Sequence, residues 1–152
     1  MPTAFESAVL NLKLFDLRRE PLLREARAWF IRDFDPQTLE QLGAVVSSDR
    51  NASFRMVLGY WDMAASLVTQ GAIPAEMFNA ANTEHFALYA KLRPFLGEVR
   101  VATKYPDYLA HIERLVTSPP DGGARIDVFD RYMQRQRALA AEGKQRANYP
   151  VA

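Results

Sequence analysis

The segment VLGYWDMAASLV, residues 57–68, is the most apolar part of the chain and carries one carboxylate, Asp62, at its centre. It lies within a stretch, 50–70, that predicts the longest helix of the protein, ending at Gly71, where a left-handed residue is common. At 3.6 residues per turn, the polar positions of this helix share one narrow stripe, formed by Arg55, Gly59, Asp62, Ser66 and Thr69. The rest of its circumference is apolar. We therefore expect a central helix whose stripe is either an exposed edge or paired with polar groups of a neighbour.

The segments around this helix also favour helical structure. Thr3 and Glu6 have the spacing of a capping box, and Asp35 followed by Pro36 is typical of an N-cap and a first helical residue. Further helix starts are indicated by proline at positions 21, 74 and 106, and the helix that starts at position 74 is expected to continue until Arg93. No segment alternates apolar and polar residues for long enough to predict a strand. The sequence therefore predicts an all-α fold, an antiparallel helical bundle of six or seven helices over residues 1–117.

The first predicted helix is apolar over much of its circumference. Two stripes lie beside each other on it, one formed by Leu10, Leu14 and Leu17 and the other by Phe5, Val9 and Leu12. We expect this helix to pack on two sides.

The C-terminal part of the chain has a different character. Residues 118–123 (SPPDGG) are rich in turn formers and predict a linker, and residues 124–152 predict a basic amphipathic arm with a frayed tail. Residues 122–152 carry six basic and three acidic side chains, a net charge of +3. Such an arm can dock on its own body, swap onto a second subunit, bind another protein or lie on an anionic surface. Its apolar face is formed by Ile126, Phe129, Tyr132 and Met133.

Composition excludes several classes of protein. The chain of 152 residues is 49% hydrophobic and 24% charged, which is ordinary for one globular domain. It contains no cysteine, so thiol catalysis, cysteine-based zinc sites and disulfides are excluded, and a reducing compartment is favoured. The first residues do not resemble a signal peptide, and no run is apolar enough for a membrane span. We therefore expect a cytoplasmic protein. Its net charge of +1 gives no overall field that would attract nucleic acid, and we expect no nucleic-acid binding.

Few residues suggest chemistry. The residues three positions before His85 and His111 are Asn82 and Tyr108, so the Glu-x-x-His pattern of di-metal bundles is missing, and we predict no metal and no cofactor. Nucleophile elbows, Walker loops and dinucleotide-binding glycine patterns are also missing. Two alternative functions stay open, a small-molecule-binding bundle and an enzyme. A small-molecule pocket would be lined by the aromatic side chains of Tyr60, Trp61 and Phe86. An enzyme would need convergence of Asp62, Glu84 and His85.

A resemblance to a known family rests on the middle of the chain. The features are the segments Val57 to Asp62, Gly71 to Pro74, Arg93 to Leu96 and Tyr105 to Tyr108, together with Arg100. In their order, residues 54–116 resemble a family of bacterial helical proteins described only as a domain of unknown function. The resemblance implies an all-helical fold and no particular activity. The acidic residue of the long helix and the later arginine of that pattern are Asp62 and Arg100, which suggests a structural ion pair between them.

Taken together, the sequence favours a non-catalytic interaction or self-association module. The predicted contact element is the C-terminal arm, through which the chain would form a homo-oligomer or bind a protein partner. The small-molecule pocket and the enzyme remain the alternatives.

Overall fold

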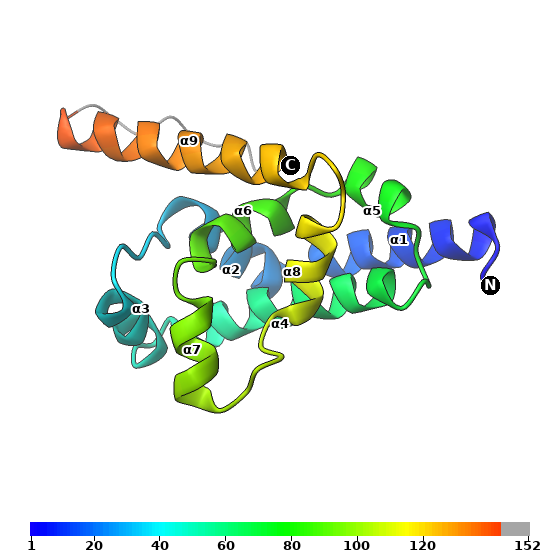
Figure 1. Ribbon diagram of the computed structural model, residues 1–152, viewed down its shortest axis with the longest axis horizontal. Helices are drawn as coiled ribbons and strands as arrows, with labels where there is room; N and C mark the ends of the chain where they lie inside the picture. Colours follow the sequence, from blue (N-terminus) through cyan, green and yellow to red (C-terminus); the bar gives the residue numbers. More distant parts are fainter. Residues whose placement is uncertain (144–152) are drawn as a thin grey trace.

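The computed structural model describes residues 1–143, and the regular structure within them is entirely α-helical (Figure 1). This confirms the predicted all-α class and helical bundle. The described residues form nine helices, which is more than predicted: α1 (Ala4–Arg18), α2 (Pro21–Arg32), α3 (Leu39–Val46), α4 (Asn51–Thr69), α5 (Ala75–Ala81), α6 (Glu84–Leu92), α7 (Leu96–Thr103), α8 (Ala110–Thr117) and α9 (Gly122–Ala141).

Two predicted helix ends are confirmed by their local geometry. The Thr3 hydroxyl accepts a hydrogen bond from the Glu6 amide, and the Glu6 carboxylate accepts one from the Thr3 amide, which completes the capping box of α1. At the end of α4, Gly71 adopts a φ of 81°, the left-handed conformation that glycine takes at low cost. Its amide donates to the carbonyl of Val68, one of the last acceptors of the helix.

The additional helix results from a break at Asn82. The sequence predicts one helix from position 74 to Arg93, but Asn82 is extended and separates α5 from α6. Its side-chain amide donates to the carbonyl of Phe78, and its side-chain oxygen accepts from Arg18. An asparagine side chain that hydrogen-bonds the nearby backbone competes with continuation of the helix. The contact with Arg18 holds the Asn82 side chain in place and thereby favours the break.

The third and eighth helices begin later than predicted. Thr38 caps α3 by accepting from the Gln41 amide, whereas Asp35, the expected cap, forms an ion pair with Arg137 of α9. Similarly, α8 begins after Leu109, whose φ of 55° places it in the left-handed region. In both cases the proline lies in the segment that precedes the helix.

The long helix α4 packs against α2 and α8 and also contacts α3 and α5 (Figure 1). Beside α8 lies α6, and α9 runs along α6. The core between these helices is closely packed, and the side chains that are fully buried in it include those of Trp61, Phe30, Leu88 and Ile112. Residues 118–121 form a short turn between α8 and α9, in which the Gly122 amide donates to the carbonyl of Pro119.

The first helix lies at the edge of the bundle and projects beyond it (Figure 1). Only one of its faces is buried, through Ser7, Leu14 and Arg18. Phe5 on the opposite face is 77% exposed and Leu12 is 66% exposed. Within this chain, α1 therefore does not pack on two sides as expected.

Among the described residues, no helix combines the length and the apolar character needed to cross a membrane.

Two glycines of the α4 region are expected to respond oppositely to alanine. Gly71→Ala places a β-carbon on a left-handed residue and is expected to destabilise the fold by about 1 kcal/mol. Gly59→Ala adds a β-carbon in open space on a helical residue and is expected to stabilise it by roughly 0.5–1 kcal/mol. Urea unfolding of both variants checks these signs, and equal effects would contradict the conformational explanation.

Candidate functional site

The most buried polar cluster centres on the Glu84 carboxylate at the start of α6. Arg27 of α2 binds it through two hydrogen bonds, Nε to Oε1 at 2.9 Å and Nη2 to Oε2 at 2.7 Å. The indole Nε1 of Trp61 in α4 donates to the same carboxylate at 2.9 Å. Only 5% of the Arg27 side chain and 13% of the Glu84 side chain are exposed. One carboxylate therefore joins three helices, with the two-pronged geometry that strengthens arginine–carboxylate pairs.

A second buried arginine extends the cluster to α1. Arg27 also donates to the backbone carbonyl of Arg18, and the Arg18 guanidinium donates to the side-chain oxygen of Asn82. Burial lowers the pKa of Arg18, and the nearby positive charge of Arg27 lowers it further. Glu84 is the carboxylate that Arg27 binds, and its negative charge also acts on Arg18 at longer range.

Asp62, the acid within the apolar segment, binds the beginning of α8. Its Oδ1 accepts a hydrogen bond from the Ile112 amide at 3.2 Å. This amide belongs to the first turn of α8, where backbone N–H groups have no partner within the helix. A carboxylate at this position also interacts favourably with the positive end of the helix dipole. Asp62 thus caps a neighbouring helix.

The expected ion pair between Asp62 and Arg100 is replaced by two separate contacts. Arg100 of α7 binds the carboxylate of Glu113 at 2.7 Å and also donates to the backbone carbonyl of Tyr108. Both acceptors belong to the segment that leads into α8 or to α8 itself. The sequence therefore identified two polar residues that fix α8, but not their partners, because helix spacing does not tell which neighbour a polar side chain meets.

The polar stripe of α4 faces the same neighbour over part of its length. Near the end of α4, the Thr69 hydroxyl lies 2.8 Å from Nδ1 of His111. Asp62 and Thr69 of the stripe are therefore paired with a neighbouring helix, whereas Arg55 and Gly59 lie on an exposed edge.

The second histidine is fully buried. Nε2 of His85 lies 2.9 Å from the side-chain oxygen of Asn79, and Nδ1 has no hydrogen-bonding partner. The ring packs among the aromatic rings of Trp61, Phe78 and Phe86. Burial, reinforced by the nearby charge of Arg125, lowers the pKa of His85 to about 3. The imidazole is therefore neutral near pH 7.

The three residues named for a possible enzyme have different partners. Asp62 binds a backbone amide of α8, Glu84 binds Arg27 and Trp61, and His85 binds Asn79. Each contact joins helices of the core. Among the described residues, no group of three or more histidine or acidic side chains is placed to hold a metal ion.

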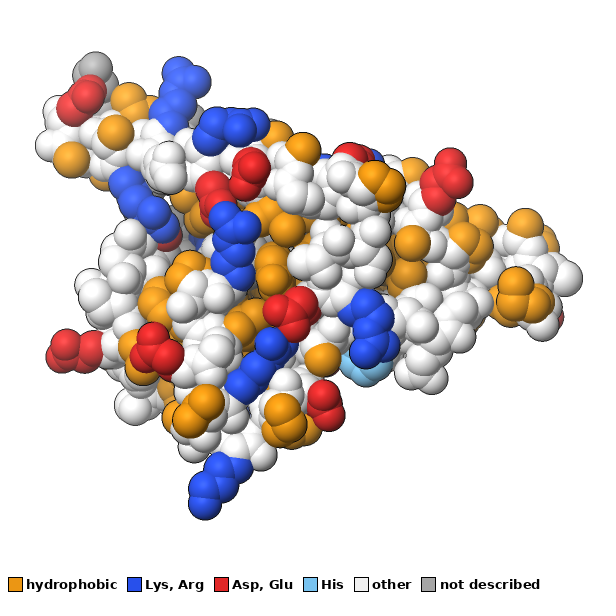
Figure 2. All heavy atoms as spheres, viewed as in Figure 1, with side chains coloured by type: hydrophobic (Ala, Val, Ile, Leu, Met, Phe, Trp, Pro, Cys, Tyr) orange, Lys and Arg blue, Asp and Glu red, His pale blue; other side chains and the backbone are white. Residues whose placement is uncertain are grey.

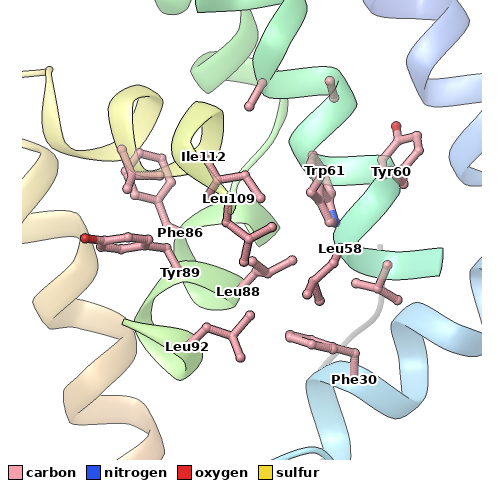
Figure 3. Packing of buried hydrophobic residues seen from close by; sticks show 14 of the residues in the cluster. Phe30, Leu58, Tyr60, Trp61, Phe86, Leu88, Tyr89, Leu92, Leu109 and Ile112 are labelled. Carbon is pink, nitrogen blue, oxygen red and sulfur yellow. The ribbon is translucent and has the colours of Figure 1, made fainter. Parts of the chain in front are cut away.

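The aromatic residues named for a pocket occupy the core. Tyr60, Trp61 and Phe86 are all buried, and Figure 3 shows Tyr60 and Phe86 on opposite sides of the packed region, with Leu88 and Ile112 between them. The Tyr60 hydroxyl donates to the carbonyl of Leu14, and burial raises its pKa to about 12. These side chains do not line either of the two hollows described next.

Two hollows occur elsewhere on the surface. The larger, about 560 Å³, lies between α4, α5, α8 and the start of α9, and its lining mixes apolar residues with both signs of charge. One of its two arginines, Arg125, is paired with Asp121. The smaller, about 320 Å³, lies between α3 and α7 and is almost entirely apolar. The helical spacing of Leu39, Leu42 and Val46 predicts a buried side of this helix, but only Leu42 is buried. Leu39 and Val46 are exposed, and all three line this groove, which the sequence did not predict.

The apolar residues of the predicted arm lie on α9 and face the body of the same chain. Ile126 is 3% exposed, and Phe129 and Met133 pack against the core, while Tyr132 is half-buried. Ion pairs of α9 with Arg93 and Asp35 accompany this packing. The tail of the predicted arm, residues 144–152, lies outside the described residues.

The most exposed apolar surface lies at the opposite end of the chain. Fifteen large hydrophobic side chains are exposed in the described part of the chain, and eight of these belong to residues 1–22. Figure 2 shows hydrophobic side chains on the end of the molecule where α1 projects. The apolar character of the first helix was predicted from the sequence, but both of its stripes were expected to pack within the chain.

Comparison with known protein families assigns the chain to one of them. A family model described as a domain of unknown function (DUF4760) matches residues 3–118, and the chain belongs to this family. The match extends from α1 to the end of α8, beyond the 54–116 region on which the resemblance was based, and α9 follows it. Searches of curated proteins and of solved structures found no match.

Removal of the Glu84 charge is expected to destabilise the fold strongly. Glu84→Gln keeps an acceptor for Trp61 but leaves the buried guanidinium group of Arg27 without its carboxylate, at an expected cost of about 3–5 kcal/mol. The double variant Arg27→Met/Glu84→Gln should lose less free energy of unfolding than the two single variants lose in sum. Urea unfolding measures these free energies. Asp121→Asn, which breaks an exposed pair, is the control, with an expected cost below about 1 kcal/mol. Additive single variants would contradict the coupling.

The buried His85 predicts a particular pH dependence. Because its pKa is lowered to about 3, the unfolded chain takes up a proton below about pH 6.5 that the folded chain does not. The free energy of unfolding should therefore fall as the pH decreases from 7.5 to 5.5, with a slope approaching about 1.4 kcal/mol per pH unit. In His85→Phe this pH-dependent contribution to the free energy of unfolding should vanish. Urea unfolding of both proteins across this range is the measurement, and parallel pH profiles would refute the assignment.

Proposed function

We propose that this protein is a non-catalytic helical module that self-associates through the exposed face of α1, in the cytoplasm. The observation that carries the proposal is the stripe of Phe5, Val9 and Leu12, which lies opposite the buried face of the helix. Burying such a stripe against a partner removes apolar surface from water, the main driving force of association. The absence of cysteine supports a reducing location.

The predicted contact element, α9, is a less suitable candidate. Its residues Ile126, Phe129 and Met133 already pack against the core of the same chain. To contact a partner through them, the protein would first have to expose that part of its core. The face of α1 requires no such rearrangement.

The charges of α1 favour a second copy as the partner. Glu6 and Lys13 lie seven residues apart and therefore share one flank of the apolar stripe. When two copies of α1 pair antiparallel about a two-fold axis, this flank meets its own copy, with Glu6 of one subunit near Lys13 of the other. The exposed part of α1 also carries Asp16 and Arg19, so the charges balance, whereas an anionic lipid surface would favour a basic excess.

A charged residue in the stripe is expected to abolish association. Leu12→Glu places a carboxylate at the centre of the proposed interface and should convert a dimer into a monomer across the concentrations tested. Light scattering after size exclusion is the measurement. Val101→Glu is the matched control, because Val101 is 79% exposed on α7 and its replacement should leave the dimer intact. A wild-type protein that remains monomeric at high concentration would refute the proposal.

Cross-linking tests the antiparallel orientation. The natural chain has no cysteine, so single-cysteine variants report unambiguously. An oxidised mixture of Phe5→Cys and Leu12→Cys should form more cross-linked heterodimer than either variant forms homodimer, because these positions have the same seven-residue spacing as Glu6 and Lys13. Equal cross-linking of each variant with itself would indicate a parallel pair and contradict the proposed orientation.

A further inference from the structure

The groove between α3 and α7 is a bounded hollow. Phe54 of α4 and Leu92 of α6 are at its base, and its volume is about 320 Å³. This lies at the lower end of the range for small-molecule pockets, about 300–1,000 Å³, and is too small for a peptide helix. In the view of Figure 2, hydrophobic side chains gather around α3 and α7.

The helix α3 turns most of its apolar face towards this groove. Leu39, Leu42, Gly43 and Val46 recur at helical spacing, and all four line it. Leu39 is 41% exposed and Val46 is 47% exposed, so the apolar lining remains accessible to solvent. At Gly43, in the middle of α3, an added β-carbon would meet no atom within 4 Å. The groove is therefore open where an ordinary core would be filled.

The few polar side chains of the lining define the chemistry of an occupant. Glu98 is the charged residue among those that line the groove. The hydroxyl of Thr103 donates to the carbonyl of Val99 and is satisfied within α7. Tyr108 also lines the groove, and a phenol can both donate and accept hydrogen bonds. An apolar ligand would thus meet a carboxylate and a hydroxyl at the edge of an apolar channel.

We propose that this groove binds a small amphiphile with a single alkyl chain and a neutral or cationic head group. The alkyl chain lies between α3 and α7, where it removes the exposed apolar side chains from water. The head group lies near Glu98, whose negative charge attracts a cation and repels a carboxylate or phosphate. The volume accommodates one chain and excludes two-chain lipids.

Three probes with the same ten-carbon chain and different head groups test the proposal. They are decyltrimethylammonium, decanol and decanoate, each used below the concentration at which it forms micelles. Isothermal titration calorimetry of the full chain should show that the cation binds most tightly, the alcohol less and the anion weakest. Failure of all three probes to bind, or tightest binding of decanoate, would overturn it.

Variants at glycine positions locate the site. Gly43→Leu fills the groove and should weaken binding of decyltrimethylammonium at least about tenfold, which corresponds to 1.4 kcal/mol. Gly43→Ala should give a smaller loss and keeps the test valid if the leucine variant misfolds. Gly97→Leu is the matched control, because Gly97 is also helical with open space but does not line the groove. Equal affinity of Gly43→Leu and Gly97→Leu would overturn the location.

The head-group assignment has its own test. Glu98→Gln should reduce the preference for decyltrimethylammonium over decanoate several-fold and leave the affinity for decanol nearly unchanged. An unchanged preference would show that Glu98 does not face the head group. The oligomeric state of each variant, measured by light scattering, separates this result from association through α1.

Discussion

The structure depends on a buried contact between Arg27, Glu84 and Trp61, through which α2, α4 and α6 meet. Removing an ion pair from water is costly, so the contact contributes less net stability than its short distances suggest. Its main effect is geometric. The two parallel bonds between Arg27 and Glu84 fix the start of α6 relative to α2, and the indole bond fixes both relative to α4. Any packing that separated these groups would leave a buried charge without its partner.

A second set of polar contacts fixes α8. Asp62 of α4 caps its first turn, and Arg100 of α7 binds Glu113. These contacts surround an apolar interface between α4 and α8, in which Trp61 and Ile112 are fully buried. Hydrophobic packing is tolerant of small rotations, whereas a helix cap requires one amide at one position. The polar stripe of the most apolar helix therefore selects a single arrangement of the helix beside it.

The two proposed contact surfaces arise from helices that the bundle covers on one side only. The outer face of α1 and the inner face of α3 both keep large apolar side chains exposed. They differ in shape, since α1 presents a convex ridge and α3 forms one wall of a groove. A convex ridge suits another protein surface, and a groove of small volume suits a small molecule. The packed core around Trp61 and Phe86 offers neither a ridge nor a groove. Asp62, Glu84 and His85, the residues named for an enzyme, each bind a structural partner.

Much of the fold was determined by local sequence. Periodicity, the capping box at Thr3 and the left-handed Gly71 act within a few residues, so the all-α class and the limits of α4 could be predicted. Only the tertiary structure decided which helices meet. The break at Asn82 depends on Arg18, the start of α3 depends on Thr38 because Asp35 binds α9, and the partner of Asp62 lies fifty residues away. Helical spacing shows that a residue is on a face, but the opposing residue comes from a distant part of the chain. For the same reason, the sequence revealed the apolar stripes of α1 and α3 without revealing that one is left uncovered and the other lines a groove.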